Sequence, residues 1–391
     1  MLWSAGALAV IGDQVFPIAI AITMLDRGAG ASELGLVLAA RVSAFVVMSL
    51  VGGVWADRLQ RKTVMIYTDI TRLFIGIGLF IAAPAAPTAV LVVFVFLAGT
   101  ATAFGMPASG AILPTILPKE FLQPANAARV ITSRLGNIVG PGIAGILIAT
   151  VGARYGFLFT GIMFAVGTLL LVRINEPKVE VDRTIKPSFV RELKEGLSLV
   201  WQIRWVAWSI AAFSVSITFV IGAEIVLIPI ISRREFGTDF VYTTAMAVFS
   251  AGAVLTALVA ARWKSRYPGL MSVIFWSFFA SVPFALAFAD SAWVIILAYF
   301  VAGMSTEPLG VFWTSALQRE VPDELRARVM SVDAMASTAL MPIGMAIAGP
   351  MMGIFGETNY LMFGVAVFLS ANLLILFVPG FIRMKTPTNN K

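Results

Sequence analysis

Twelve apolar runs, each long enough to cross a bilayer as a helix, follow one another along this chain of 391 residues. A membrane-spanning helix needs about 20 apolar residues, because the hydrocarbon core is about 30 Å thick. The runs lie near residues 3–24, 33–56, 63–83, 88–112, 124–150, 155–174, 206–231, 240–261, 269–288, 292–316, 326–354 and 358–380. A membrane β-barrel would instead show segments of about ten residues with alternating polarity. The pattern therefore predicts an all-α membrane protein with twelve transmembrane helices.

The first run is interpreted as a span and not as a secretory signal peptide. It has no basic residues before the apolar stretch, and Asp13 and Pro17 interrupt that stretch. A cleavable signal combines a positively charged start with a short, uninterrupted apolar region. We therefore count residues 3–24 as the first of the twelve helices.

Two residue types are missing from the sequence, which contains no Cys and no His. The lack of Cys removes disulfides and thiolate chemistry. The lack of His removes the usual proton shuttle and the commonest transition-metal ligand. The sequence also has no GxxxxGK[ST] phosphate loop. We therefore expect no enzymatic activity, no metal and no cofactor, and we expect energy to come from an ion gradient or another subunit.

Lys and Arg residues are concentrated on one side of the predicted spans. If the N-terminus is inside, 20 of them fall in inner segments, and only Arg27, Arg154, Arg233 and Arg234 fall in outer loops. Because cytoplasmic segments carry the excess of basic residues, both termini are predicted to be cytoplasmic. The formal net charge of +7 then indicates contact with the acidic inner leaflet and not nucleic-acid binding.

A long polar segment, residues 175–205, divides the spans into six and six. It predicts an N-terminal lobe (1–174), a cytoplasmic linker (175–205), a C-terminal lobe (206–380) and a cytoplasmic tail (381–391). Within the linker, SFVRELKEGLSLVWQIR has one apolar helical stripe. This stripe predicts an amphipathic helix, either lying on the inner membrane surface or serving as a solvated connector.

The two halves of the chain repeat short motifs in the same order. FLAG at 96–99 recurs as FVAG at 300–303, and PKEF at 118–121 recurs as PDEL at 322–325, both 204 residues later. VGPGIAG at 139–145 is matched with AGPMMG at 348–353, and IGDQVFPIAI at 11–20 with IGAEIVLIPI at 221–230. A parallel repeat of six helices is typical of two-lobed transporters.

The stretch VGGVWADRLQRKTV, residues 51–64, resembles the loop signature G-x-x-x-D-R-x-G-R-K of the major facilitator superfamily. The matching residues are Gly53, Asp57, Arg58, Arg61 and Lys62, whereas Gln60 stands at the usual Gly. The resemblance implies a cytoplasmic loop that closes an inner gate, with Asp57 facing the eleventh helix and Arg326 or Arg328. The alternative, a topology signal alone, explains the basic residues but not Asp57 or the glycines.

A second resemblance lies in the fifth span, SRLGNIVGPGIAGIL, which is similar to the Gly-Pro signature of drug–proton antiporters. Its residues are Gly136, Gly140, Pro141 and Gly145. The run MPASGAILPTILPKEFLQPANA and the Gly-Asp pair of the first span resemble macrolide and enterobactin exporters. Val95 stands where the superfamily often carries an Arg.

These resemblances imply a secondary active exporter of amphipathic or cationic organic compounds. It would act as a monomer in a bacterial-type inner membrane, by alternating access and proton antiport. Export of a lipid or siderophore-type cargo on the same fold is the alternative. The expected partners are the substrate, protons and the lipid bilayer.

Ionisable residues within the spans are costly and usually functional. At about 1.5 Å per residue, Asp13 and Arg41 reach the same depth and are predicted to pair, either as a static ion pair or as an exchange site. Asp69 and Arg72, three residues apart, are predicted to form a structural pair. The candidates for substrate or proton coupling are Asp13, Arg41, Glu224, Glu307, Arg134 and Asp333.

Overall fold

The computed structural model describes residues 1–56, 59–177, 197–260, 262–263 and 265–385. Within these ranges the regular elements are helices, and twelve segments are long and apolar enough to cross a membrane. The segments are Leu2–Asp26, Ala31–Ser49, Arg61–Ala82, Thr88–Ala111, Lys119–Val151, Arg154–Val172, Arg204–Phe236, Phe240–Ala257, Pro268–Phe288, Ala292–Glu320, Val332–Phe355 and Glu357–Ile375. The predicted all-α membrane fold is confirmed, and the protein is a multi-pass integral membrane protein.

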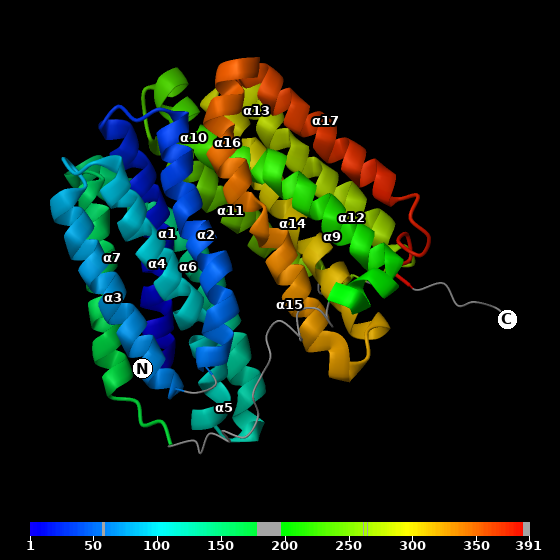
Figure 1. Cartoon of the computed structure of the whole chain (residues 1–391), viewed down its shortest axis with the longest axis horizontal. Helices are drawn as coiled ribbons and strands as arrows, with labels where there is room; N and C mark the ends of the chain where they lie inside the picture. Colours follow the sequence, from blue (N-terminus) through cyan, green and yellow to red (C-terminus); the bar gives the residue numbers. More distant parts are fainter. Residues whose placement is uncertain (57–58, 178–196, 261, 264, 386–391) are drawn as a thin grey trace. The chain divides into compact units, whose positions relative to one another are not determined.

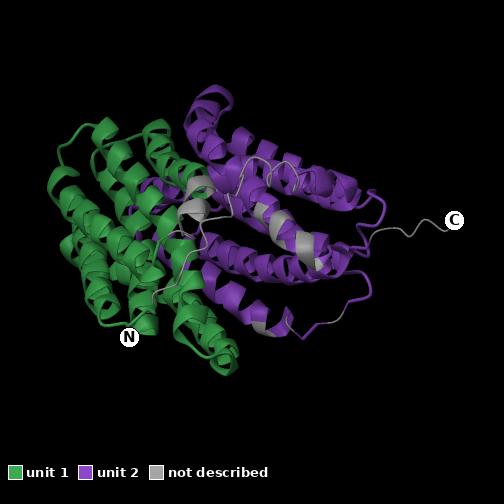
Figure 2. Cartoon of the chain, turned by 60° about the horizontal axis from the view of Figure 1, so that its bottom comes forward, with its two compact units in different colours: residues 1–187 green, residues 188–391 purple. Residues whose placement is uncertain are grey.

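The chain divides into two compact units, residues 1–187 and 188–391 (Figure 2). The division falls inside the segment 175–205 that we predicted to be the linker. Most of the predicted amphipathic helix lies outside the described residues, which omit 178–196. Its position on the membrane stays a prediction.

The first unit contains the first six spans (Figure 1). Its elements are α1 (Leu2–Asp26), α2 (Ala31–Ala56), α3 (Arg61–Ala82), α4 (Thr88–Ala111), α5 (Leu113–Ile116), η1 (Lys119–Phe121), α6 (Leu122–Val151) and α7 (Arg154–Val172). Helix α1 packs against α6 and α7, α2 packs against α4, and α3 packs against α4 and α7. These pairings connect the helices in the order α2, α4, α3, α7, α1 and α6.

The second unit repeats this arrangement. Its elements are α9 (Arg204–Ser216), η2 (Ile217–Ile221), α10 (Gly222–Phe236), α11 (Phe240–Ala260), α12 (Pro268–Ser277), η3 (Phe278–Ala280), α13 (Ser281–Phe288), α14 (Ala292–Glu320), α15 (Asp323–Ala339), α16 (Met341–Phe355) and α17 (Glu357–Ile375). Helix α10 packs against α16, α9 against α17, α11 against α14, and both α12 and α13 against α14 and α17. Each pairing of the first unit therefore has a counterpart in the second.

Residues 204 positions apart also occupy matching places at helix ends. Gly152 ends α6 with φ 96°, and Gly356 ends α16 with φ 81°. Such positive φ values strain residues that carry a Cβ. Pro118 and Pro322 likewise precede η1 and α15 with almost the same backbone angles. The proposed matches of 139–145 with 348–353 and of 11–20 with 221–230 are wrong in register. They require offsets of 209 (348 − 139) and 210 (221 − 11) residues, whereas these helix ends are 204 residues apart.

Several predicted spans are less regular than their apolar runs suggest. The seventh contains a π turn, η2, between α9 and α10, and the ninth contains a 3₁₀ turn, η3. The eleventh begins at Asp323 and is divided at Leu340 into α15 and α16. Hydropathy reports only burial in an apolar medium, so it does not register these changes in helical pitch.

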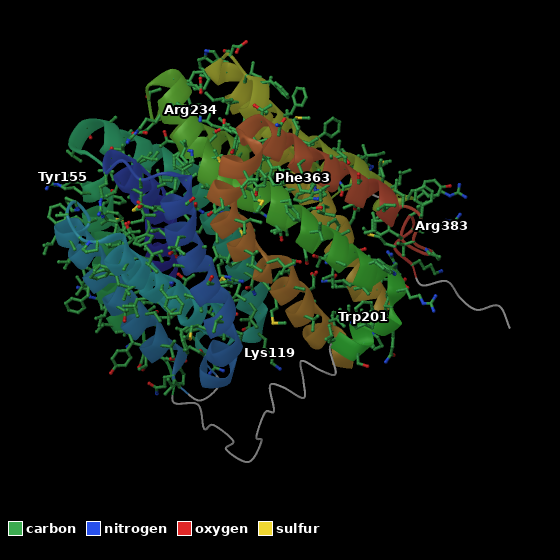
Figure 3. The ribbon with its side chains drawn as sticks, turned by 45° about the horizontal axis from the view of Figure 1, so that its top comes forward. Lys119, Tyr155, Trp201, Arg234, Phe363 and Arg383 are labelled. Carbon is green, nitrogen blue, oxygen red and sulfur yellow. The ribbon has the colours of Figure 1, made fainter. Side chains whose placement is uncertain are left out.

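We predicted that Arg233 and Arg234 lie in an outer loop, and this is wrong. Both residues lie in the last turn of α10, which Gly237 caps. Arg233 pairs with Asp239 at 2.7 Å. Arg234, labelled in Figure 3, donates from Nη1 and Nη2 to the two carboxylate oxygens of Glu357, at 2.8 and 2.7 Å. Cations near a helix C-terminus are favourable. The two pairs connect α10 to Asp239, the residue before α11, and to α17.

Candidate functional site

Asp13 lies midway along α1, and two arginines from neighbouring helices contact its carboxylate. The Nη2 of Arg41, on α2, donates to Asp13 Oδ1 at 3.1 Å. The Nη1 of Arg72, on α3, lies 3.5 Å from Asp13 Oδ2. The structure thus contains the pair that we predicted between Asp13 and Arg41, and it adds Arg72, which we expected to pair with Asp69 alone.

The expected structural pair of Asp69 and Arg72 belongs to the same network. Arg72 Nη1 is 4.0 Å from Asp69 Oδ1, which is farther than its 3.5 Å to Asp13. Two carboxylates and two guanidiniums therefore form one group with no net formal charge, which we call the charge cluster (Asp13, Arg41, Asp69 and Arg72). Our assignment of Asp69 and Arg72 as a separate pair is corrected, because Arg72 reaches across to α1.

The members of the charge cluster differ in their access to solvent. The side chain of Arg72 is 8% exposed and that of Asp69 is 10% exposed, whereas that of Asp13 is 32% exposed. The Arg72 guanidinium also lies over the ring of Phe164, with Cζ 4.7 Å from the ring centre, a favourable cation–π arrangement. Asp13 is consequently the more exposed of the two acids in the cluster.

A cavity of about 410 Å³ lies inside the first unit beside the charge cluster. Residues of α1, α3, α4, α5, α6 and α7 line it, and Asp13, Asp69 and Arg72 are among them. Gln14 and Asn137 also line it, and Gln14 Nε2 donates to Asn137 Oδ1 at 2.8 Å. Half of the residues that line it are apolar or glycine. Such a mixed wall suits an amphipathic ligand.

The Gly-Pro segment of α6 brings that helix close to α1. A Cβ on Gly136 would lie 2.6 Å from Val10 Cγ1, and a Cβ on Gly140 would lie 2.5 Å from Gln14 Cβ. Both distances are too short for real atoms, so a larger residue at either position would push the helices apart. Pro141 is buried beside them, and Gly145 lies further along the same helix. Small residues permit close helix packing in membranes, and here they fix the position of Gln14 at the cavity.

The loop that resembles a gate motif is only partly described. Gly53 falls within α2, and Asp57 and Arg58 lie outside the described residues, so the predicted gate contact stays a prediction. Arg61 and Lys62 begin α3, and their backbone N–H groups donate to Glu176 Oε1 at 3.3 Å and Oε2 at 2.8 Å. A carboxylate at a helix N-terminus satisfies donors that have no partner within the helix.

The side chain of Lys62 makes the reciprocal contact at the end of α7. Its Nζ donates to the carbonyl oxygens of Val172 at 2.8 Å and of Ile174 at 2.6 Å. An ammonium group at a helix C-terminus satisfies carbonyls that the helix leaves free. Lys62 and Glu176 together therefore fasten the beginning of α3 to the end of α7.

We expect Glu176→Ala to lower the stability of the first unit by about 0.5–2 kcal/mol, the usual cost of losing an N-terminal capping side chain. Glu176→Gln, which keeps one acceptor oxygen, should have a smaller effect. Thermal unfolding of the purified protein in detergent measures both. Glu120→Ala, which removes an exposed acid of η1, is the control and should leave the midpoint unchanged. Equal midpoints for Glu176→Ala and Glu120→Ala would contradict the capping role.

The remaining coupling candidates are not among the residues that line this cavity. Glu224, on α10, is 5% exposed. Asp333, on α15, accepts hydrogen bonds from Trp313 Nε1 at 2.8 Å and from the Ser337 hydroxyl at 3.4 Å. Arg134 lies on α6, and Glu307 lies on α14. None of these side chains lines the cavity beside the charge cluster, and their roles in transport stay predictions.

Three features of the site were not anticipated from the sequence. Gln14 and Asn137 are polar residues inside apolar runs, a signal that could have drawn attention to them. Glu176 follows a span in a segment interpreted only as a linker, so no pattern marked it. The participation of Arg72 depends on which face of α3 turns toward α1, and the hydropathy pattern of one helix does not specify this.

Comparisons with known proteins agree with this architecture. The sequence profile of the Major Facilitator Superfamily matches residues 2–345. Macrolide efflux protein A of Streptococcus pyogenes is 23% identical over 356 residues, which cover 89% of this chain and 87% of that protein. Multidrug efflux pump Tap of Mycobacterium tuberculosis (strain ATCC 25618 / H37Rv) is 26% identical over 364 residues, which cover 89% of this chain and 85% of Tap.

Solved structures share the fold at lower sequence identity. A D-xylose-proton symporter matches with a TM-score of 0.76 and 14% identity, covering 99% of this chain and 98% of that one. The nucleoside transporter NupG matches with a TM-score of 0.74 and 12% identity, covering 98% of each chain. Identities this low support the fold alone.

Proposed function

The chain belongs to the Major Facilitator Superfamily, and we propose that it exports amphipathic organic compounds across the cytoplasmic membrane, driven by inward proton flow. Transport would proceed by alternating access of the two units. The observation that carries the proposal is the partly exposed Asp13, held between Arg41 and Arg72 at the wall of a cavity. The names of the relatives, a macrolide efflux protein and a multidrug efflux pump, support export as the direction.

The cavity supports an amphipathic substrate more than a strongly cationic one. Its volume of about 410 Å³ lies within the range of about 300–1,000 Å³ that is typical of ligand pockets. The acids of the charge cluster are already balanced by Arg41 and Arg72, and Arg129 adds a further positive group to the wall. While Asp13 contacts both Arg41 and Arg72, the charge cluster has no excess negative charge that would attract a cationic substrate.

The charge cluster suggests how a proton could be coupled to movement. Asp13 bridges α1 to α2 and α3 through Arg41 and Arg72. A proton on the Asp13 carboxylate removes its negative charge and so weakens both contacts, because each depends on attraction between opposite charges. The three helices would then be free to rearrange, and loss of the proton would restore the contacts.

The cavity itself is tested by filling it. Gly6 lines the cavity, and a Cβ added there would meet no atom within 4 Å. We expect Gly6→Phe to lower transport severely without lowering the thermal midpoint, because the ring enters empty space. Transport of a fluorescent amphipathic dye by reconstituted vesicles measures the effect.

The matched control is Gly142→Phe. A Cβ added to Gly142 would likewise meet no atom within 4 Å, and this residue does not line the cavity. This variant should transport normally. Normal transport by Gly6→Phe would show that the cavity is not on the substrate's route.

A further inference from the structure

A second acid is buried inside the other unit with no partner for one of its oxygens. Glu224, on α10, is 5% exposed, and its Oε2 has no hydrogen-bond partner within the described part of the chain. Tyr242 of α11 and Tyr299 of α14 lie beside it. The Tyr299 hydroxyl is buried and lies beside the Glu224 carboxyl, but the pair does not meet hydrogen-bond geometry in the described part of the chain. A protonated carboxyl has both a donor and an acceptor for such a pocket.

The elements that pack against α10 within this unit offer no cation to Glu224. Helix α10 packs against η2, α11, α13 and α16. Helix α14 contributes Tyr299, and its charged residues, Glu307, Arg319 and Glu320, are at least eight residues from Tyr299, or about 12 Å along the helix. The sequences of η2, α13 and α16 contain no ionisable side chain, and Tyr242 is the sole ionisable residue of α11. The two tyrosines are therefore the titratable groups that face Glu224 from neighbouring elements of the unit.

The charged residues of α10 itself are distant and already engaged. Arg233, Arg234 and Glu235 follow Glu224 by nine to eleven residues, which places them at least about 13 Å further along the helix. Arg233 pairs with Asp239, and Arg234 pairs with Glu357 and Glu235. None of them neutralises Glu224.

The contrast with the first unit is informative because the two units repeat the same helix pairings. Asp13 in the first span receives Arg41 and Arg72 from the second and third spans. The corresponding spans of the second unit, α11 and α12–α13, contain no Lys or Arg. The second unit thus keeps an acid in its first span but lacks both basic partners.

An ionised carboxylate buried without a partner is among the most costly groups in a protein interior, and such groups generally take up a proton instead. We infer that Glu224 forms a second proton-binding site, separate from the charge cluster and enclosed with Tyr242 and Tyr299 inside the second unit. The inference rests on the proposed function where it assigns this proton to transport. The bound proton is held as a neutral carboxylic acid, and no other bond forms or breaks.

The backbone next to Glu224 is suited to a change of conformation that would release the proton. The π turn η2 ends at Ile221, three residues before Glu224, and such turns are frequent at functional sites. A Cβ on Gly222 would lie 2.9 Å from the Gly344 backbone, so α10 and α16 touch directly. A small displacement of α10 along this contact would give Glu224 access to water.

Infrared difference spectroscopy of the purified protein tests the protonation directly. At neutral pH the wild-type spectrum should contain a carboxylic-acid carbonyl band that Glu224→Gln lacks and that Asp13→Asn retains. Tyr299→Phe should shift this band, because it changes the polar group beside the acid. This second variant keeps the test decisive if Glu224→Gln does not fold.

Two results would overturn the inference. Identical carboxylic-acid regions in the wild type and Glu224→Gln would show that Glu224 is ionised. If Glu224→Gln does not fold, the test is the Tyr299→Phe spectrum. A carboxylic-acid band that stays unshifted in this variant would show that Glu224 does not give rise to the band.

Transport measurements separate this inference from the proposed function. If the inference is right, Glu224→Gln loses pH-gradient-driven transport in vesicles but retains substrate exchange without a gradient. If the wild type itself ignores the gradient, the proposed proton coupling fails, whereas the infrared result for Glu224 stands unaffected. Full gradient-driven transport by Glu224→Gln would contradict a role of this proton in coupling.

Discussion

Asp13→Asn is expected to abolish transport that is driven by a pH gradient. Asn keeps the size of the side chain and one acceptor oxygen, but it cannot take up and release a proton. It also leaves Arg41 and Arg72, now 3.1 and 3.5 Å from the carboxylate oxygens, with one anion fewer in the cluster. Substrate uptake by inverted vesicles or proteoliposomes, with an imposed gradient, measures the loss.

The stability of this variant must be measured in parallel. Hydrogen bonds to charged groups contribute about 1.5–3 kcal/mol, and the partial exposure of Asp13 reduces that contribution. We therefore expect a modest fall in the thermal midpoint without loss of the folded state. Asp290→Asn removes the same charge from the exposed turn before α14 and should transport normally. Gradient-driven transport by Asp13→Asn at the wild-type rate would exclude Asp13 as the coupling acid.

Gly140→Ala is expected to destabilise the first unit by about 1–3 kcal/mol, the usual cost of inserting a methyl group into a tightly packed contact. The added Cβ would lie 2.5 Å from Gln14 Cβ, so α6 must move away from α1. Because Gln14 holds Asn137 at the cavity wall, we also expect slower transport. Thermal unfolding in detergent and vesicle transport measure the two effects.

Gly142→Ala supplies a control from the same motif. The two positions lie on different faces of α6, and a Cβ on Gly142 would meet nothing within 4 Å. Ala favours a helix over Gly by about 1 kcal/mol, so this variant should be as stable as the wild type or slightly more so. Similar midpoints for the two variants would mean that close packing is not the role of the Gly-Pro segment.

Much of the fold follows from the sequence, because a bilayer imposes length and apolarity on every span. The twelve spans and the division within 175–205 are visible as runs of apolar residues and a polar gap. Matching depths were enough to predict the pair of Asp13 and Arg41, since helical rise converts residue number into distance. The repeat offset of 204 residues, seen in FLAG/FVAG and PKEF/PDEL, also relates Gly152 and Gly356 at the ends of α6 and α16.

The rest of the site depends on how each helix is rotated about its axis and on which helices touch. The depth of a residue in the membrane specifies neither. Arg72 joins the charge cluster only because α3 turns that face toward α1. The π turn before Glu224 rotates the residues that follow it about the helix axis, and the hydropathy of the span does not reveal this rotation. Glu176 contacts α3 across more than a hundred residues of sequence, so no local pattern could identify it.

The central claim, proton-driven export of amphipathic compounds, is tested most directly by a substrate panel in reconstituted vesicles with and without an imposed pH gradient. The panel should contain macrolides, amphipathic dyes, a lipid analogue and a siderophore. We predict that at least one neutral or weakly basic amphipathic compound is transported against its own gradient, and only while the pH gradient is present. Transport that persists unchanged after the pH gradient is collapsed would contradict proton coupling and favour facilitated movement of a lipid or siderophore-type cargo.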